Sequence, residues 1–196
     1  MSTNQPVSQS TDAPEPVSFA DEPIVLVDAR DREVGQAAKA DCHKGAGTLH
    51  RALSVFLFDA EGRTILQQRT AQKPLWPLYW SNSCCSHPRV GESVEAAAKR
   101  RVREELGVEA EMTYVYKFRY RAEYQDLGAE HELCWVHVGT FSGELQPHPD
   151  EIEAIRRLTP AELDAEIDQH PEQLTPWAKM EWRRLRQQFP HVIDNL

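Results

Sequence analysis

Short apolar runs and alternating segments fill the first two thirds of the chain, a pattern typical of β-strands. The expected strands lie at residues 24–27, from 33 to 36, at 53–58, at 64–68, and at about 112–124 and 130–142. The turn at residues 59–62 predicts a β-hairpin of its two flanking strands. A second turn, which contains Gly128, is expected to join the last two strands.

Helical signals lie in the centre and at the end of the chain. Ser93 is a plausible N-cap for a helix that continues through Leu106 and ends at Gly107. From Asp150 onward the chain is expected to be helical, at about 161–169 and at 176–189. A β-rich middle with one central helix and later helices predicts an α/β or α+β fold, in which helices sandwich a mixed β-sheet.

Composition separates a tail from one domain. Residues 1–20 are rich in Ser, Thr, Gln and Pro, and such a segment buries too little apolar surface to order itself, so a disordered tail is expected. Residues 21–196 are expected to form a single domain. The formal charge of −9 argues against a nucleic-acid partner, which requires a basic face.

The same data predict a cytoplasmic protein. No apolar run approaches the ~20 residues that span a bilayer, and residues 1–20 lack the basic and apolar regions of a secretory signal. The four cysteines are therefore expected to be reduced thiols, at positions 42, 84, 85 and 134. A disulfide between Cys42 and Cys134 is the less favoured alternative.

Cys85 and His87 are the first candidates for chemistry. They lie two residues apart, so an extended backbone directs both side chains to one side. Glu130 and Glu132 share one face of a predicted strand in the same way. His43 and His50 lie on or beside a loop, because two glycines between them disfavour a helix. If these residues fold together, they suit a metal-dependent enzyme in which Cys85 handles a proton.

Each of these residues also has a simpler interpretation. A lone histidine is more often a surface or hydrogen-bonded residue than a ligand, and Glu130 and Glu132 alone would suit an exposed strand face. Cys84 and Cys134 are expected to be inert core thiols. On the central helix, Arg100 with Glu104 and Arg101 with Glu105 are spaced to pair on a solvated face.

The spacing of Glu92, Arg100, Glu104, Glu105 and Gly107 resembles the Nudix box. Ser86 stands where that box has its first glycine, and Arg101 replaces the glutamate after the arginine. Nudix hydrolases use that glutamate to hold metal ions, so the replacement favours a Nudix-like fold with a different reaction.

Further segments resemble the type 1 isopentenyl-diphosphate isomerases. The matching segments are 49–52, 76–80, 82–88, 118–122, 130–132 and 175–177, and the resemblance runs from about residue 23 to 185. It implies that residues 21–196 form a Nudix-like isomerase domain that interconverts isopentenyl diphosphate and dimethylallyl diphosphate through a tertiary carbocation. The expected partner is a small diphosphate, and neither a membrane nor a nucleic acid.

The resemblance also implies the roles of individual residues. Cys85 and Glu132 are the expected acid and base, Tyr120 hydrogen-bonds to Glu132, and Trp177 covers the hydrocarbon. The residues expected around the phosphates are Lys39, Arg69, Lys73 and Arg101. A divalent ion, Mn²⁺ or Zn²⁺, is expected among His43, His50, His87, Glu130 and Glu132. A Mg²⁺ bound with the diphosphate is expected at Glu105, with the backbone carbonyl of Cys85 as a further ligand.

Several alternatives stay open. Trp177 also suits a core position at a helix start. A Nudix diphosphohydrolase would release phosphate and would not need Cys85. A non-enzymatic binding module would use Cys85 and the histidines to hold structural zinc. The expected assembly is a monomer or a weak dimer.

Overall fold

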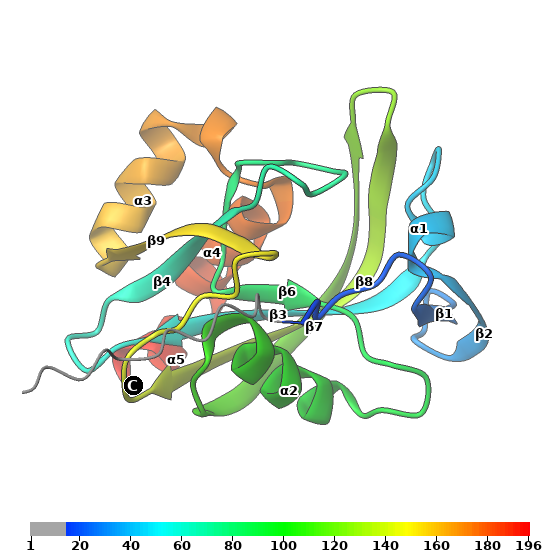
Figure 1. Ribbon diagram of the computed structural model, residues 1–196. Coiled ribbons are helices and arrows are strands. Elements are labelled where there is room, and N and C mark those ends of the chain that lie inside the picture. Colours follow the sequence, from blue (N-terminus) through cyan, green and yellow to red (C-terminus); the bar gives the residue numbers. More distant parts are fainter. Residues whose placement is uncertain (1–14) are drawn as a thin grey trace, which may run out of the picture.

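The sheet is built around β3 (His50–Phe58) in the computed structural model, which describes residues 15–196 (Figure 1). β3 pairs in parallel with β8 (Gly128–Phe141), from His50 opposite Glu132 to Phe58 opposite Thr140. It also pairs antiparallel with the short β6 (Cys84–Ser86). β8 forms a long antiparallel hairpin with β7 (Ala110–Tyr124), which rises above the sheet in Figure 1.

The remaining strands extend the sheet on either side of β3. They are β1 (Pro23–Val27), β2 (Glu33–Ala38), β4 (Thr64–Arg69), β5 (Trp80–Ser81) and β9 (Ile152–Leu158). β1 pairs antiparallel with both β2 and β3, and β4 pairs antiparallel with both β5 and β9. Because β3 and β8 are parallel and the other pairs antiparallel, the predicted mixed sheet is confirmed.

Helices cover both faces of this sheet, as predicted. The long helices are α2 (Val94–Leu106), α3 (Pro160–Gln169) and α4 (Pro176–Gln188), and the short ones are α1 (Lys39–Cys42), η1 (Pro171–Gln173) and α5 (Pro190–Asp194). α2 begins at the predicted N-cap, since the Ser93 hydroxyl accepts a hydrogen bond from the Ala96 amide at 3.2 Å. It ends at Gly107, which has φ 70°.

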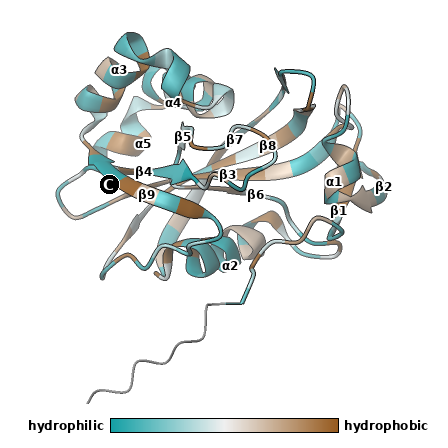
Figure 2. Cartoon of the chain, turned by 45° about the horizontal axis from the view of Figure 1, so that its top comes forward, coloured by the Kyte–Doolittle hydropathy of each residue, from teal (hydrophilic) through white to brown (hydrophobic). Residues whose placement is uncertain are grey.

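Alternation along β3 divides the core into two layers. Leu53, Val55 and Leu57 pack against the buried face of α2. Phe56 and Phe58 point the other way and pack against Trp182 of α4 and its neighbours from α3 and α5. Figure 2 shows hydrophobic residues along the strands and hydrophilic ones over much of α3 and α2. The even-numbered face of β3 is thus the face toward the C-terminal helices.

Three expectations about the strands and their turns need correction. Residues 152–158 form a strand instead of a helix, because the open edge of β4 pairs with them along its length. Their apolar residues Ile152, Ile155 and Leu158 are three apart, which imitates a helical pattern. The expected β-hairpin around the turn at 59–62 is much shorter than predicted. Phe58 and Thr64 form the one residue pair between β3 and β4.

Gly128 is the third correction, since it begins β8 and does not lie in the turn. A Cβ atom at this position would lie 2.3 Å from the carbonyl oxygen of His43. The next residue, Ala129, donates its amide to the same oxygen at 2.9 Å. Only a glycine therefore lets the hairpin approach the loop that carries His43.

Residues 15–20 are not independent of the domain, although the sequence groups them with the tail. The carbonyl of Val17 accepts a hydrogen bond from Arg101, and the hydroxyl of Ser18 accepts one from Lys39 at 2.6 Å. The expected tail is thus corrected at its C-terminal end, because composition does not reveal these contacts. Its residues 1–14 lie outside the described part of the chain.

No helix within residues 15–196 has both the length and the apolar character needed to cross a membrane. The four cysteines all lie in this range and are free thiols, as expected.

Replacing Ser93 with Ala is expected to destabilise the protein by about 1 kcal/mol, because the Ala96 amide loses its capping partner. Urea unfolding followed by circular dichroism measures this difference. Ser142→Ala is the matched control, since this serine is exposed in the loop after β8. Equal stabilities for the two variants would contradict the assigned cap.

Candidate active site

Three histidines and two glutamates from distant parts of the chain converge at one end of β3. Their ligand-type atoms all lie within 4.8 Å of one another, and the residues are His43, His50, His87, Glu130 and Glu132. This is the set that the isomerase resemblance implies. Close packing of carboxylates and imidazoles in the protein interior is favourable when a cation lies between them.

The strand register explains why these residues meet. His50 lies opposite Glu132 in the parallel β3–β8 pair, so both side chains leave the same face of the sheet. Glu130 shares this face two residues earlier on β8. His43 follows α1 and is brought close by the contact that Gly128 permits. His87 follows β6, which lies along β3.

The hydrogen bonds of the histidines fit a metal site. The Nδ1 atoms of His43 and His50 bond to the backbone carbonyls of Lys39 and Thr48 at 2.6 and 2.7 Å. This arrangement protonates Nδ1 and leaves the Nε2 lone pair directed inward. The Nε2 atoms of His50 and His87 are only 3.1 Å apart, and that of His87 lies 3.3 Å from Oε1 of Glu132, so these three atoms are close enough to share one metal ion.

Protonation states support the same conclusion. Burial holds the pKa of His87 well below its usual range, so this imidazole is neutral and able to bind a metal. Burial would also lower the pKa of His43, but the Glu130 carboxylate at 2.8 Å raises it above its usual value. These residues therefore could hold a divalent metal ion.

Glu132 is also hydrogen-bonded to Tyr120. The Tyr120 hydroxyl donates to its Oε2 at 2.7 Å, which is the hydrogen bond expected from the sequence. Burial would raise the pKa of Glu132, but the neighbouring His50 side chain and the hydrogen bond from Tyr120 lower it. Burial and then the Glu132 charge raise the pKa of Tyr120 well above its usual value, so its phenol keeps its proton.

The Cys85 thiol lies apart from the histidine cluster, beside the middle of β3. It donates to Oδ1 of Asn82 at 2.7 Å and accepts from the indole N–H of Trp177 at 3.2 Å. The hydroxyls of Ser81 and Ser54 are 3.6 and 3.7 Å away. Burial raises the pKa of Cys85 to about 12, so this group is a thiol. Cys84 faces the α2 core, as expected.

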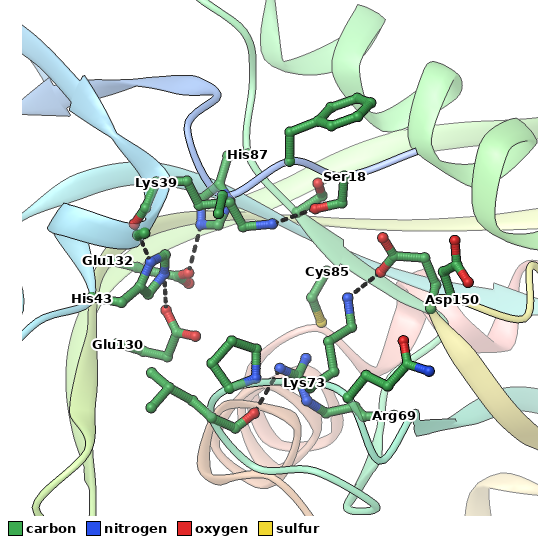
Figure 3. Close-up of a pocket in the computed structure, with 18 of the residues that line it drawn as sticks. Ser18, Lys39, His43, Arg69, Lys73, Cys85, His87, Glu130, Glu132 and Asp150 are labelled. Atoms are coloured by element: carbon green, nitrogen blue, oxygen red, sulfur yellow. Dashed lines mark hydrogen bonds and ion pairs between the residues drawn. The ribbon is translucent and has the colours of Figure 1, made fainter. Parts of the chain in front are cut away.

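A cavity of about 550 Å³ connects these groups. Figure 3 shows His43, Glu130, Glu132 and Lys39 on one side, Lys73, Arg69 and Asp150 on the other, and Cys85 between them. Of the residues predicted for the site, those that line it are Lys39, His43, Arg69, Lys73, Cys85, His87, Arg101, Tyr120, Glu130, Glu132 and Trp177. His50 lies directly behind this lining and is fully buried.

The four predicted basic residues make the cavity suitable for an anion. Burial, and then repulsion from Lys73, lowers the pKa of Lys39 to about 8. The guanidinium of Arg69 lies 5.3 Å from the Trp177 ring and donates to the carbonyls of Leu75 and Trp76. Arg101 pairs with Glu105 at 2.7 Å and with Glu151 at 3.2 Å.

Glu105 does not occupy the position expected of it. Its carboxylate is buried, pairs with Arg101, and does not line the described cavity. It therefore presents no oxygen to a Mg²⁺ ion in the cavity in this conformation. The expectation that it binds Mg²⁺ stays a prediction, which requires Arg101 to exchange Glu105 for another anion.

Sequence reasoning missed several residues of the site. Glu151 lines the cavity and pairs with Lys73 and Arg101, which lower the pKa of its carboxyl to about 2 against the effect of burial. Asn82 and Ser54 surround the Cys85 thiol. A buried acid next to a cluster of cations has no signature in the sequence. By contrast, Asn82 lies three residues before Cys85, in a segment already singled out.

We expect His50→Ala to lower the affinity for Mn²⁺ or Zn²⁺ by about 100-fold or more, because even the residues that orient ligands contribute 10- to 100-fold. Isothermal titration calorimetry measures this affinity. His131→Ala is the matched control: this residue lies on the same strand between Glu130 and Glu132 and contacts the carbonyl of Gly47 instead. Equal affinity of the two variants would contradict the site.

Relatives with similar sequences share most of this chain. An isopentenyl-diphosphate Delta-isomerase of Nocardia farcinica is 49% identical over 79% of this chain and 89% of its own length. An isopentenyl-diphosphate Delta-isomerase 1 of Photorhabdus laumondii is 41% identical over 85% of this chain and 96% of its own. The alignments thus include nearly the whole of each relative.

The fold has known counterparts too. The protein DR0079 of Deinococcus radiodurans superposes with a TM-score of 0.69, at 25% identity over 83% of this chain and 98% of that one. A MutT protein of Methanosarcina mazei shares the fold at 13% identity, with a TM-score of 0.57 over 71% of this chain and 94% of that one. Residues 48–178 match the NUDIX domain. The chain belongs to the NUDIX domain family and to the family of isopentenyl-diphosphate Delta-isomerases.

Proposed function

We propose that this protein interconverts isopentenyl diphosphate and dimethylallyl diphosphate. The observation that carries the proposal is that one cavity is lined both by Cys85 and by the Tyr120–Glu132 pair, with basic side chains at its other walls. The printed names of the relatives support the same activity. The reaction moves a double bond, so it requires a proton to be added at one carbon and another to be removed at a neighbouring carbon.

Cys85 and Glu132 are suited to these two proton transfers. The Cys85 thiol is protonated and buried beside Trp177, and it serves the face of the substrate at which the C2 proton is exchanged. Glu132, with the Tyr120 hydroxyl bonded to it, serves the other face. Which group acts first depends on the direction of the reaction.

The surroundings protect a cationic intermediate. Tyr120 and Trp177 are both less than 10% exposed, and their aromatic faces enclose the space beside Cys85. Aromatic faces stabilise a cation by about 0.5–2 kcal/mol, and the exclusion of water prevents its capture. His43, His50, His87, Glu130 and Glu132 would hold a divalent ion, for which we propose Mn²⁺ or Zn²⁺, and its positive charge would orient Glu132 and lower its basicity.

The diphosphate is proposed to bind the four basic residues. Lys73 and Arg101 pair with Glu151 without substrate, so a phosphate group would take over cations that an internal carboxylate now neutralises. A Mg²⁺ ion bound with the diphosphate remains part of the proposal, with Glu105 and the Cys85 carbonyl as its ligands. We place the reaction in the cytoplasm and expect a monomer or a weak dimer.

Diphosphate hydrolysis is the second candidate, because residues 48–178 match the NUDIX domain and residues 92–107 resemble the Nudix box of hydrolases. It is disfavoured here, since Arg101 occupies a position where the hydrolase box has a carboxylate and its guanidinium neutralises Glu105. A structural zinc module is the third candidate, and it leaves the basic cavity and the Tyr120–Glu132 pair without a role.

The test is incubation with isopentenyl diphosphate, Mg²⁺ and Mn²⁺ in D₂O, followed by NMR of the organic product and an assay of free phosphate. Dimethylallyl diphosphate that carries deuterium is the expected product. Cys85→Ser and Glu132→Gln are expected to lower turnover by about 10²–10⁴-fold, the contribution of a positioned acid or base. Both variants should unfold at nearly the temperature of the unmodified protein.

Cys84→Ser is the matched control for Cys85→Ser, because Cys84 is adjacent but faces the α2 core, and it should retain its turnover. Release of phosphate without isomer would identify a hydrolase. Unfolding by a chelator without any diphosphate binding would identify a zinc module.

A further inference from the structure

A glutamate lies in the apolar interface between α4 and the sheet. Glu181 is completely buried, on the helix face that also carries Trp177, Ala178, Trp182 and Leu185. An isolated carboxylate in such surroundings is strongly disfavoured, so the group requires a specific reason. Nothing in the proposed reaction described above uses it.

The side chain of Glu181 has few polar neighbours. The Cys134 thiol lies 3.5 Å from its Oε1 atom, while its Oε2 atom is buried without a hydrogen-bond partner. The nearby Tyr116 hydroxyl donates to the backbone carbonyl of Glu181 and so does not serve the carboxyl group. Burial raises the pKa of Glu181 to about 8, and this carboxyl therefore holds a proton near neutral pH.

A short chain of polar atoms connects this carboxyl group to the active-site thiol. The Cys134 thiol donates to the Ser54 hydroxyl at 3.4 Å, and the Ser54 hydroxyl donates to the Cys85 sulfur at 3.7 Å. Strand register produces the chain, because Cys85 lies opposite Ser54 on β6 and β3. Cys134 lies on β8, next to β3. All of these side chains lie on the face of the sheet toward α4.

The other polar neighbours of Cys85 do not offer such a connection. Ser81 bonds to Thr175 and Asn82. Asn82 bonds to the backbone carbonyls of Val55 and Cys84. Among the described residues that hydrogen-bond to Cys85, only Ser54 continues toward a second group able to hold a proton.

The proposed reaction would benefit from a second proton-holding group behind Cys85. The acid and the base lie on different sides of the substrate. After each turnover the acid has therefore lost a proton and the base has gained one. The indole of Trp177 covers the Cys85 thiol, and bound substrate fills the cavity in front of it. A proton that leaves or returns to Cys85 therefore benefits from an internal route.

We propose that Glu181 is the internal proton partner of Cys85, linked to it through Ser54 and Cys134; this inference rests on the isomerase function proposed above. The Cys85 thiolate left by proton donation takes the Ser54 hydroxyl proton, and Ser54 regains one from Glu181, directly or by way of Cys134. One S–H bond forms, one carboxyl O–H bond breaks, and the hydroxyl is restored, so the net change is one proton moved from Glu181 to Cys85. When Cys85 acts as the base, the reverse transfer first moves its proton to the ionised form of Glu181, and the resulting thiolate then accepts the substrate proton.

Glu181 acts only through Cys85 and touches no substrate, so it is a positioning residue and not a catalytic one. The titratable groups that face it are Cys134 and Glu132 from β8, Tyr116 from β7 and Cys85 from β6. The ionised Glu132 favours a neutral Glu181, whereas the contacts with Cys134 and Ser54 favour its ionised form, and burial outweighs them.

The test compares Glu181→Gln with the unmodified protein. Glutamine keeps the shape and polarity of the side chain but does not release a proton. We expect kcat to fall by about 10- to 100-fold, with KM for isopentenyl diphosphate and the melting temperature nearly unchanged. Ser54→Ala, which interrupts the chain at its middle, is expected to do the same. Glu172→Gln is the matched control, since this exposed residue lies nine positions earlier and should leave kcat unchanged.

Infrared spectroscopy gives a readout that packing alone would not change. At about pH 7 exposed carboxyl groups are ionised, so the unmodified protein should show the carbonyl band of a protonated carboxyl that Glu181→Gln lacks. Full kcat in Glu181→Gln, or no such band in the unmodified protein, would overturn the inference. Absence of isomerase activity in the unmodified protein would instead overturn the function on which it rests.

Discussion

The parallel pairing of β3 with β8 is the interaction on which the site depends. It places His50 opposite Glu132 and Ala52 opposite Cys134, so that one face of two neighbouring strands carries imidazole, carboxylate and thiol side chains. A shift of register by one residue would turn all of these side chains to the α2 face. Apolar residues of the same strands, such as Phe56 and Val138, fix the register by packing under the C-terminal helices.

The side chains on this face change along the strands from polar to aromatic. It begins with imidazole and carboxylate groups around His50, continues with Cys134 and Ser54 next to the Cys85 thiol, and ends in the aromatic core around Trp182. Polar groups this deeply buried are tolerated when they are paired or bind a cation. The histidine–carboxylate cluster, the Cys85 thiol and Glu181 are therefore three cases of polar groups that are buried on this face of the sheet.

Much of this arrangement was predictable, and the exceptions have physical causes. The cap at Ser93, the end of α2 at Gly107 and the shared face of Glu130 and Glu132 follow from local rules, so the sequence predicts them. The resemblance to isomerases selected the five residues that the fold brings together. β9 was not predicted, because pairing with the edge of β4 overrides its helix-like spacing.

Contacts between residues far apart in the sequence do not follow from local patterns, so they were not predicted either. The pairing of Glu151 with Lys73 and Arg101 joins segments that are far apart in the sequence. Glu181 did leave a local signal, since it lies four residues after Trp177 on the apolar face of a predicted helix. A charged residue on the apolar face of a helix is unusual, so the helical pattern alone is enough to mark Glu181 as a candidate.

The separation of Cys85 from the metal cluster is the central claim, because a thiol and an imidazole two residues apart equally suit a zinc site. A crystal structure with bound Mn²⁺, located by anomalous scattering, tests it most directly. The account predicts one ion among His43, His50, His87, Glu130 and Glu132, with the Cys85 sulfur unligated beside Trp177. A metal ion bound to the Cys85 sulfur together with His87 would contradict it.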